Sequence, residues 1–217
     1  MKDRALVVNE VYVSVQGEST FAGLPCVFVR LTACDLRCSY CDTEYAFYEG
    51  KKRLLENILE EIRSHQIPLV EITGGEPLLQ KNVLPLMKVL CDEGFDVLIE
   101  TSGAHDISQI DSRVHCIMDL KCPDSGMEGR NRYENISCLK MKDEVKFVIA
   151  SRNDYEWSRQ KVREFELQDK VRTVLFSAVF GKCEPQALVE WIVEDKLPVR
   201  FQLQMHKFIW EPKKRGV

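Results

Sequence analysis

Short β-branched apolar runs alternate with amphipathic stretches along almost the whole chain. Eight runs have the length and composition of buried strands, namely residues 7–15, 26–33, 69–73, 96–101, 115–120, 145–150, 172–179 and 199–205. Four stretches between them carry apolar residues at helical spacing, namely residues 54–65, 82–93, 153–166 and 185–195. Strands rich in Val, Ile and Leu that alternate with helices predict βαβ units and a buried parallel sheet.

The number of such units indicates an open barrel. About six βα units fit into 217 residues, whereas a closed eight-unit barrel usually takes ~250 residues. We therefore expect an α/β fold, a partial (open) TIM-type barrel, in a single domain that covers residues 1–217. Residues 121–143 are polar and rich in turn formers, so we expect a surface excursion with a short helix there.

Charge and composition argue against several classes of protein. The formal net charge is −4 at pH 7, which does not favour a general nucleic-acid binder. No apolar run approaches the ~18 residues of a membrane span, and the first residues lack the apolar core of a signal peptide. The nine cysteines are an odd number without a secretory signal. We expect a cytoplasmic protein with reduced thiols that binds neither nucleic acid nor membrane.

Three cysteines form a compact motif directly after the strand predicted at residues 26–33. Cys34, Cys38 and Cys41 have the spacing C-x3-C-x2-C. Three thiolates cannot close a tetrahedral structural zinc site, but they can hold a four-iron cluster at three corners and leave one iron open. The spacing and the ligand count favour the cluster. The alternative is a zinc site completed by Cys26 or a distant histidine, and the other cysteines are expected to act as small apolar residues.

Polar groups gather where the predicted parallel strands end. The segment ITGGEP (72–77) places two glycines at a turn, where a ligand can approach the backbone and free N–H groups can bind a carboxylate. The next strands end in ETSG (100–103) and MDLKCP (118–123). Active sites of barrels lie at this edge. The candidates there are Ser102, Asp119, Lys121 and, at a later strand, Ser177. Lys121 has a solvated strand-end charge as its alternative.

The cysteine loop, with TGGEP one βα unit later, resembles the radical S-adenosylmethionine (radical SAM) superfamily. The resemblance implies that an electron from a [4Fe-4S] cluster cleaves SAM to a 5′-deoxyadenosyl radical. The cluster ligands, which carry the catalysis, would be Cys34, Cys38 and Cys41. The resemblance implies a further set of residues that bind SAM, namely Tyr40, Asp42, Gly74, Gly75, Glu76, Ser102, Asp119, Lys121 and Ser177.

Further motifs resemble one family within that superfamily. VQGES (15–19), CDT (41–43) and the closing RGV resemble the 7-carboxy-7-deazaguanine synthase family of queuosine and 7-deazapurine biosynthesis, and the match runs in order along the chain. The resemblance implies conversion of 6-carboxy-5,6,7,8-tetrahydropterin to 7-carboxy-7-deazaguanine with loss of ammonia. It also implies a homodimer and a reductant such as flavodoxin. The implied substrate-binding residues are Val15, Gln16, Gly17, Glu18, Arg30, Thr73, His206 and Val217.

The family also implies Mg²⁺, which the hydroxyl of Thr43 would bind as a hard oxygen ligand. Three positions have simpler interpretations: Thr43 as a helix N-cap, His206 as a core histidine, and the KKR of the tail as a solvated charge run. Ser19 stands where the family commonly has glycine. The rival functions are a radical SAM activase that acts on a partner protein and a zinc-binding interaction module.

Overall fold

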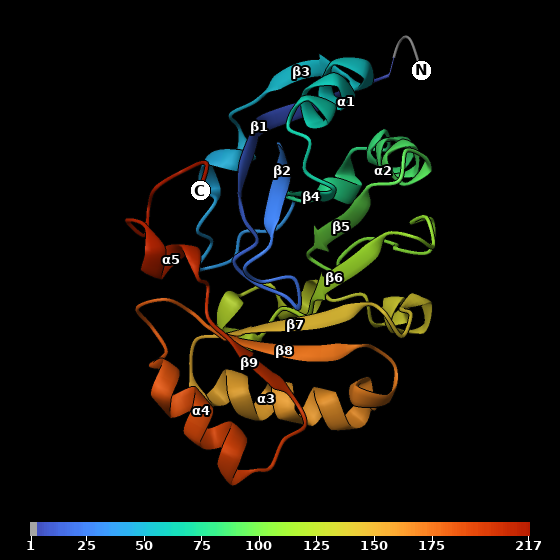
Figure 1. Ribbon diagram of the computed structural model, residues 1–217. Coiled ribbons are helices and arrows are strands. Elements are labelled where there is room, and N and C mark those ends of the chain that lie inside the picture. Colours follow the sequence, from blue (N-terminus) through green and yellow to red (C-terminus); the bar gives the residue numbers. More distant parts are fainter. Residues whose placement is uncertain (1–3) are drawn as a thin grey trace.

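A computed structural model describes residues 4–217 of the protein. One sheet contains all nine strands of these residues, in the order β3-β1-β2-β4-β5-β6-β7-β8-β9 (Figure 1). The strands are β1 (Ala5–Val15), β2 (Pro25–Leu31), β3 (Lys51–Leu54), β4 (Leu69–Gly74), β5 (Asp96–Thr101), β6 (His115–Asp119), β7 (Glu144–Ile149), β8 (Thr173–Ala178) and β9 (Arg200–Gln202). Neighbours from β2 to β9 pair in parallel, whereas β1 is antiparallel to β2 and β3. The predicted open, partial barrel is confirmed.

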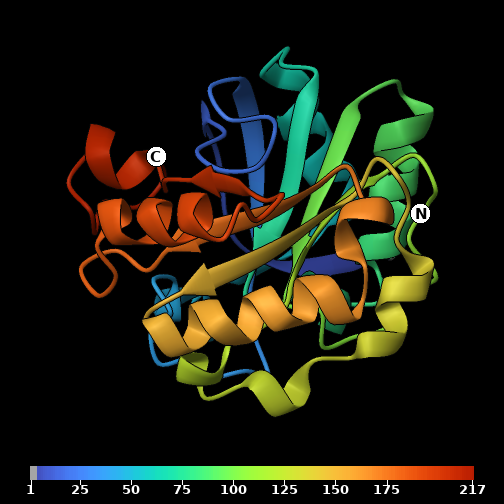
Figure 2. The ribbon, with the colours of Figure 1, turned by 90° about the horizontal axis from the view of Figure 1, so that it is seen from below.

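The longer α-helices lie on the outer face of this curved sheet, whereas a short one after β9 lies against the loop that follows β1. The α-helices are α1 (Leu55–Ser64), α2 (Val83–Asp92), α3 (Arg152–Glu164), α4 (Pro185–Glu194) and the short α5 (His206–Ile209). α1 buries Ile58, Leu59 and Ile62, which recur at the spacing of one helix face. Figure 2 shows α3 running along the outer side of β7 and β8. The four predicted helices are confirmed to within two residues at each end.

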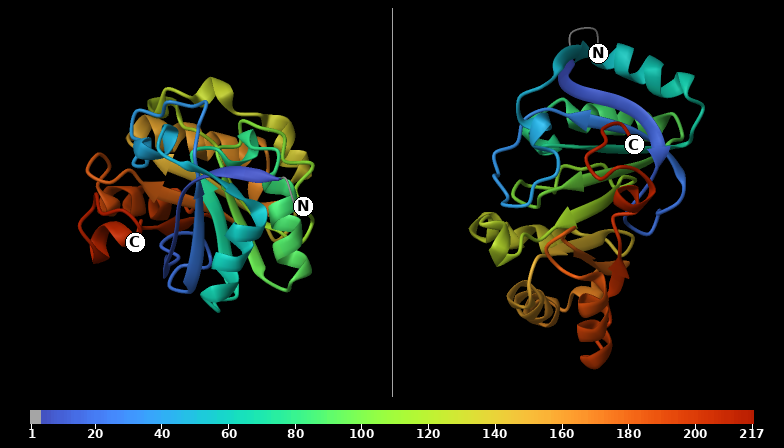
Figure 3. Two further views of the ribbon diagram at one scale, coloured as in Figure 1. Left: turned by 90° about the horizontal axis from the view of Figure 1, so that it is seen from above. Right: turned by 90° about the vertical axis from the view of Figure 1, so that its left-hand side faces the viewer.

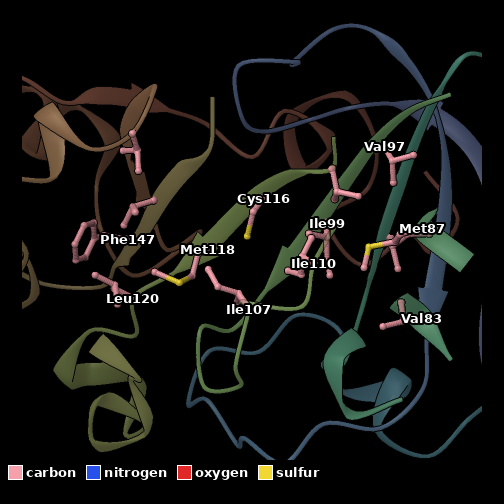
Figure 4. Packing of buried hydrophobic residues seen from close by; sticks show 14 of the residues in the cluster. Val83, Met87, Val97, Ile99, Ile107, Ile110, Cys116, Met118, Leu120 and Phe147 are labelled. Atoms are coloured by element: carbon pink, nitrogen blue, oxygen red, sulfur yellow. The ribbon is translucent and has the colours of Figure 1, made fainter. Parts of the chain in front are cut away.

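Two connections differ from the predicted βα alternation. No α-helix joins β5 to β6 or β6 to β7, so fewer than six complete βα units exist among the described residues. Ile107 and Ile110 of the first connection are buried and pack near Ile99 and Met118, where a helix would otherwise cover the sheet (Figure 4). The second connection has three 3-10 helices (Pro123–Ser125, Glu128–Arg130 and Tyr133–Cys138) instead of the single short helix that we expected.

The edge strand β3 was not predicted. Its sequence KKRL is mostly exposed and shows no apolar alternation. β3 forms only because its backbone pairs with β1, with Ala5 opposite Leu54. A charged edge strand of this kind blocks further strand addition.

The inner face of the sheet changes from apolar to polar along each strand. A small cluster that includes Phe28, Leu69, Leu98, Ile117 and Leu175 fills the amino-terminal part of the barrel. Because side chains alternate between the faces of a strand, the residue two positions later faces inward as well. Those residues are Arg30, Glu71, Glu100, Asp119 and Ser177. The barrel interior is therefore polar toward the carboxyl ends of the strands.

All nine cysteines are free. Among the helices of residues 4–217, none combines the length and the apolar character that crossing a membrane requires.

Candidate active site

Lys146 lies at the centre of the polar interior. Its Nζ is 3.1 Å from both Glu18 Oε2 and Glu100 Oε1, and 3.7 Å from Asp119 Oδ1. Only 6% of Lys146 is exposed, so these carboxylates compensate for its loss of hydration. Neither Lys146 nor Glu100 was predicted as a site residue, since one charged residue inside a strand forms no motif. The signal that could have identified both residues is the alternation along their strands, which places their side chains on the inward-facing side of the sheet.

The loop Gln16–Ser19 enters this interior from the end of β1. Gln16 Nε2 donates a hydrogen bond to Glu71 Oε2 at 2.8 Å, and Gln16 Oε1 accepts one from the Glu18 backbone at 2.5 Å. Glu18 Oε1 accepts a hydrogen bond from Gln204 Nε2 at 3.1 Å. The loop is therefore held by β4 on one side and by the segment after β9 on the other. Val15, which precedes it, ends β1 opposite Pro25.

Glu71 is almost completely buried beneath Gln16, with 2% of the residue exposed. Burial raises the pKa of the Glu71 carboxyl well above its usual range, and the nearby Glu100 raises it further. Burial also raises the pKa of Glu100, against the opposing effect of Lys146. The sequence analysis did not identify Glu71, which adds a further acid to the interior, beside Glu18, Glu100 and Asp119.

Arg30 lies at one side of the interior, opposite Thr73 in the pairing of β2 with β4. Its Nε donates to Glu10 Oε1 at 2.9 Å, and its Nη2 donates to Tyr12 OH at 2.8 Å. The Arg30 side chain is 13% exposed. The other edge of the guanidinium, formed by Nη1 and the second hydrogen of Nη2, thus faces away from these two contacts.

The cysteine loop is held over the strand ends by contacts with distant segments. Ser39 donates from its backbone N to Ser125 O at 3.0 Å and from Oγ to Asp124 O at 2.6 Å. Tyr40 OH donates to Val148 O at 3.0 Å. Asp35 pairs with His105 at 3.1 Å and with Arg130 at 2.6 Å. Connections that lack an α-helix thus support the loop.

The three thiols are half-buried. Burial raises the pKa of Cys34 and Cys38, and the Lys121 ammonium acts in the opposite direction on Cys38. Within residues 4–217, no group of three or more His, Cys, Asp or Glu side chains converges to hold a single metal ion. A structural zinc ion needs four converging ligands, and Cys26 is fully buried in the inner apolar cluster. A four-iron cluster takes each thiolate on a different iron, so this donor set fits the cluster better than zinc.

The two glycines of TGGEP let the end of β4 approach the cysteine loop. A Cβ at Gly75 would collide with the carbonyl oxygen of Ala33 and lie 3.0 Å from Cys34 Cβ. Gly74 has a φ of +130°, and a Cβ there would collide with Leu31 O. The N–H groups of Gly75 and Glu76 donate to Leu31 O (3.2 Å) and Ala33 O (2.8 Å). These two N–H groups are thus not free for a ligand carboxylate, in contrast to our expectation.

Glu76 is fully buried and faces the end of β5. Its carboxylate accepts hydrogen bonds from Ser102 N at 2.7 Å, Ser102 Oγ at 2.6 Å and Thr101 Oγ1 at 3.0 Å. Glu76 and Ser102, both predicted to bind SAM, therefore bind each other in this structure.

At the carboxyl ends of β6 and β8, two buried oxygens have no hydrogen-bond partner among the described residues. They are Asp119 Oδ1 and Ser177 Oγ. Buried polar atoms are rarely left unpaired, so these atoms fit a polar ligand between β6 and β8. Lys121 Nζ is 2.5 Å from Asp119 Oδ2, and its side chain is only 14% exposed. The alternative of a solvated strand-end charge at Lys121 is wrong.

Thr43 precedes a 3-10 helix (Glu44–Phe47) but makes no side-chain cap hydrogen bond. Its Oγ1 lies 3.8 Å from Cys41 Sγ. The cap interpretation requires that hydrogen bond and is therefore wrong. Asp42 pairs with Lys207 at 2.7 Å. Asp42 is exposed, and the adjacent Lys207 ammonium holds the pKa of its carboxyl below the usual range.

His206 and the tail close one side of the site. His206 is half-buried, which excludes the core interpretation, and burial lowers its pKa. The His206 ring packs closely against the backbone of Gly17, since a Cβ at Gly17 would lie only 3.1 Å from His206 Nδ1.

The tail returns to β1 (Figure 3), where a Cβ at Gly216 would lie 3.8 Å from Glu10 Oε2. Arg215 pairs with Glu49 at 2.7 Å and lies 3.8 Å above the Tyr45 ring. Lys213, Lys214 and Arg215 are all exposed, in agreement with a solvated charge run, and Arg215 adds these two surface contacts, whereas Val217 behind it is half-buried.

Comparisons with known proteins agree with this geometry. The sequence profile of the radical SAM superfamily matches residues 29–115. A 7-carboxy-7-deazaguanine synthase from Koribacter versatilis is 46% identical, over 97% of this chain and 99% of that protein. One of the same name from Chlorobaculum tepidum is 43% identical, over 98% of this chain and 97% of that protein.

The solved structures agree at the level of the fold. The crystal structure of QueE from Escherichia coli has a TM-score of 0.78 at 23% identity and covers 93% of this chain and 95% of its own. That of Streptococcus suis SuiB bound to S-adenosylmethionine has a TM-score of 0.54 at 17% identity and covers 79% of this chain and 44% of its own. A radical SAM fold uses a [4Fe-4S] cluster and SAM, and neither the activase nor the zinc-module alternative is favoured. The chain belongs to the family of 7-carboxy-7-deazaguanine synthases, radical SAM enzymes of 7-deazapurine biosynthesis.

Proposed function

We propose that the chain binds 6-carboxy-5,6,7,8-tetrahydropterin in the polar barrel interior and converts it to 7-carboxy-7-deazaguanine. The observation that carries this proposal is the meeting of Gln16, Glu18 and Arg30 in one interior that the cysteine loop covers. Hydrogen-bonding side chains for a pterin and a guanidinium for its carboxylate thus lie near the three thiols.

The substrate carboxylate binds the free edge of Arg30. A guanidinium presents two parallel N–H groups to a carboxylate, and the bonds to Glu10 and Tyr12 leave one such edge available. The amide of Gln16 and the carboxylate of Glu18 can pair with the aminopyrimidinone edge of the pterin, which has adjacent donors and acceptors. The remaining substrate contacts come from Val15, Gly17, Thr73, His206 and Val217.

Cys34, Cys38 and Cys41 would hold the [4Fe-4S] cluster. When bound, the cluster and SAM supply the radical that removes the hydrogen at C6 of the pterin. Asp119 Oδ1 and Ser177 Oγ, neither of which has a hydrogen-bond partner among the described residues, can accept hydrogen bonds from the hydroxyl groups of SAM. The other cofactor-binding residues are Tyr40, Asp42, Gly74, Gly75, Glu76, Ser102 and Lys121, of which Glu76 and the two glycines act by shaping the turn.

Mg²⁺ would bind Thr43 beside the carboxylate of the substrate. The Thr43 hydroxyl makes no helix-cap bond, and magnesium typically takes few protein ligands together with water and substrate oxygens. We further propose that the 217 residues act as one unit in the cytoplasm, as a homodimer reduced by a flavodoxin-type protein. The single sheet, with strands from Ala5 to Gln202, supports the first of these points.

An anaerobic assay with reconstituted iron tests the proposed reaction. We expect the protein, SAM and a chemical reductant to turn 6-carboxytetrahydropterin into a product with the mass and absorbance of 7-carboxy-7-deazaguanine. Cys38→Ala removes one of the three thiolates and should abolish turnover, whereas Cys91→Ala, outside the motif, should retain it. Iron-loaded protein that cleaves SAM but leaves the pterin unchanged would contradict the proposed substrate.

A further inference from the structure

Glu10 joins Arg30 to the helix that follows Thr43. Its Oε1 accepts a hydrogen bond from Arg30 Nε at 2.9 Å and a second from Tyr45 OH at 2.9 Å. Tyr45 belongs to the 3-10 helix that begins at Glu44, directly after Thr43. One carboxylate oxygen therefore contacts both a residue proposed to bind the substrate and the segment proposed to bind magnesium.

The surrounding residues restrict this carboxylate and the guanidinium to one arrangement. Glu10 pairs across the strands with Arg30, next to an irregularity in the β1–β2 register between Val8 and Glu10. Arg30 lies 5.7 Å from the centre of the Tyr12 ring and 5.9 Å from that of Tyr45. Tyr12 in turn stacks on Phe28, with ring centres 4.9 Å apart. The Glu10 side chain is 21% exposed, so the pair is partly shielded from water.

A guanidinium that must bind a carboxylate through two bonds needs a fixed plane. Glu10 takes the Nε position and Tyr12 takes one hydrogen of Nη2, which leaves the Nη1–Nη2 edge as the two-pronged donor. Without Glu10, the Arg30 side chain can rotate, and burying its charge loses a compensating partner. The acid therefore fixes which edge of Arg30 is presented to a ligand.

We propose that Glu10 is a positioning residue that selects for the carboxylate of the substrate. It acts through Arg30, which it orients, and through Tyr45, which it binds at a set position relative to Arg30. This inference rests on the proposed binding of the substrate carboxylate by Arg30.

Ligand binding tests the inference without turnover. The probes are 6-carboxypterin, a stable oxidised analogue of the substrate, and pterin, which lacks the carboxylate. Both would be titrated by fluorescence against the reconstituted protein with SAM. We expect Glu10→Gln to lower the affinity for 6-carboxypterin by at least about tenfold, because it disturbs a charge-assisted contact. The affinity for pterin should stay unchanged. Glu49→Gln, at an exposed acid that pairs with Arg215, should change neither.

If Glu10→Gln lowered the affinities for 6-carboxypterin and pterin equally, or changed neither affinity, the inference would be overturned. Tyr45→Phe provides a second variant that removes only one bond to Glu10, so it tests the same link if Glu10→Gln does not fold. Tyr45→Phe should lower the affinity for 6-carboxypterin but not for pterin, and by less than Glu10→Gln does. Arg30→Lys separates the inference from the proposed function. If Arg30→Lys loses the preference for 6-carboxypterin over pterin while Glu10→Gln keeps that preference, the inference about Glu10 fails and the proposed function stands. If Arg30→Lys also keeps that preference, Arg30 does not bind the carboxylate.

Discussion

At the scale of single residues, Thr43 shows how an absent bond changes an assignment. A threonine before a helix ordinarily accepts a hydrogen bond from the first turn, and Thr43 accepts none with its side chain. Its hydroxyl is thus not engaged by the helix; Thr43 Oγ1 lies 3.8 Å from Cys41 Sγ, and Thr43 is two residues before Tyr45.

We expect Thr43→Ala to abolish most of the magnesium response of the reaction rate. The alanine variant should lose little stability, because no cap bond is removed, rather than the ~1 kcal/mol that a cap would contribute. Thr43→Ser should recover most of the response, since it keeps the hydroxyl. The measurement is the rate against magnesium concentration. An unchanged magnesium curve in Thr43→Ala would show that this hydroxyl is not a ligand.

Ser19 is the second informative residue, because its φ is +59°. This is the left-handed region that favours glycine, the residue that the family resemblance leads us to expect at this position. Ser19 N donates to Gln202 Oε1 at 2.8 Å and Ser19 Oγ accepts from Phe21 N at 3.1 Å. These bonds stabilise a serine in a conformation that costs on the order of 1 kcal/mol.

Ser19→Gly should therefore unfold at higher denaturant concentration than Ser19→Ala. Both variants lose the hydroxyl, but only glycine relieves the positive φ, and the expected difference is about 1 kcal/mol. Chemical denaturation of the two variants side by side measures it. If the alanine variant were the more stable, the positive φ at this position would not carry the expected cost.

At the scale of elements, the turn after β4 and the cysteine loop form one structural unit. Gly75 lies against Ala33, which itself has a φ of +80° just before Cys34. The backbone N–H groups of the turn bind the end of β2 rather than a ligand. The shape of the loop thus depends on a residue some 40 positions away in the sequence.

Gly75→Ala should lower the iron bound per chain after reconstitution. The added methyl group collides with the Ala33 carbonyl, and relieving an overpacked contact of this kind typically costs 1–3 kcal/mol. The loop that carries the thiols would have to move. Gly129→Ala is the matched control, because a Cβ there meets nothing within 4 Å. Iron content by a colorimetric assay decides the matter, and equal loading in both variants would contradict the steric role.

The same elements show which features the sequence could predict. Apolar runs predicted eight of the nine strands, because burial of both faces leaves a strong pattern, and the exposed KKRL of β3 left none. The cysteine spacing predicted the loop. The sequence could not predict that Glu76 turns toward Ser102, or that Lys146, Glu71 and Glu10 join the site. Those contacts depend on strand register, which brings residues far apart in sequence to one face.

At the scale of the whole molecule, the barrel interior concentrates charges that cost free energy to bury. Glu71, Glu100, Asp119 and Lys146 lie on four adjacent strands. The Lys146 ammonium compensates for the charges of Glu100 and Glu18. The Glu71 carboxyl, in contrast, has only the amide of Gln16 as its hydrogen-bond partner within residues 4–217. Such a residue lowers the stability of the fold but serves ligand binding, because a ligand site retains buried polar groups where apolar residues would give a more stable core.

The pH dependence of stability should reveal this cost. Burial raises the pKa of Glu71 well above its ordinary value of 4.5, so above pH 4.5 the folded protein holds this proton more tightly than the unfolded chain does. The folded state then binds more protons, and the contribution of Glu71 to stability falls as the pH rises through that window. Glu71→Gln keeps an oxygen for Gln16 Nε2 and removes the titration.

We therefore expect the free energy of unfolding of Glu71→Gln to exceed that of the wild type near pH 8, by on the order of 1 kcal/mol. This difference in stability should become smaller toward pH 5. Urea denaturation at several pH values measures both curves. Glu93→Gln is the contrasting variant, because Arg63 lowers the pKa of that surface carboxyl and its pairing stabilises the fold above pH 4.5. That variant should be less stable than the wild type at neutral pH and should converge with it in acid. A constant gap for Glu71→Gln across the whole range would mean that Glu71 stays ionised inside the barrel, with Lys146 close enough to neutralise it.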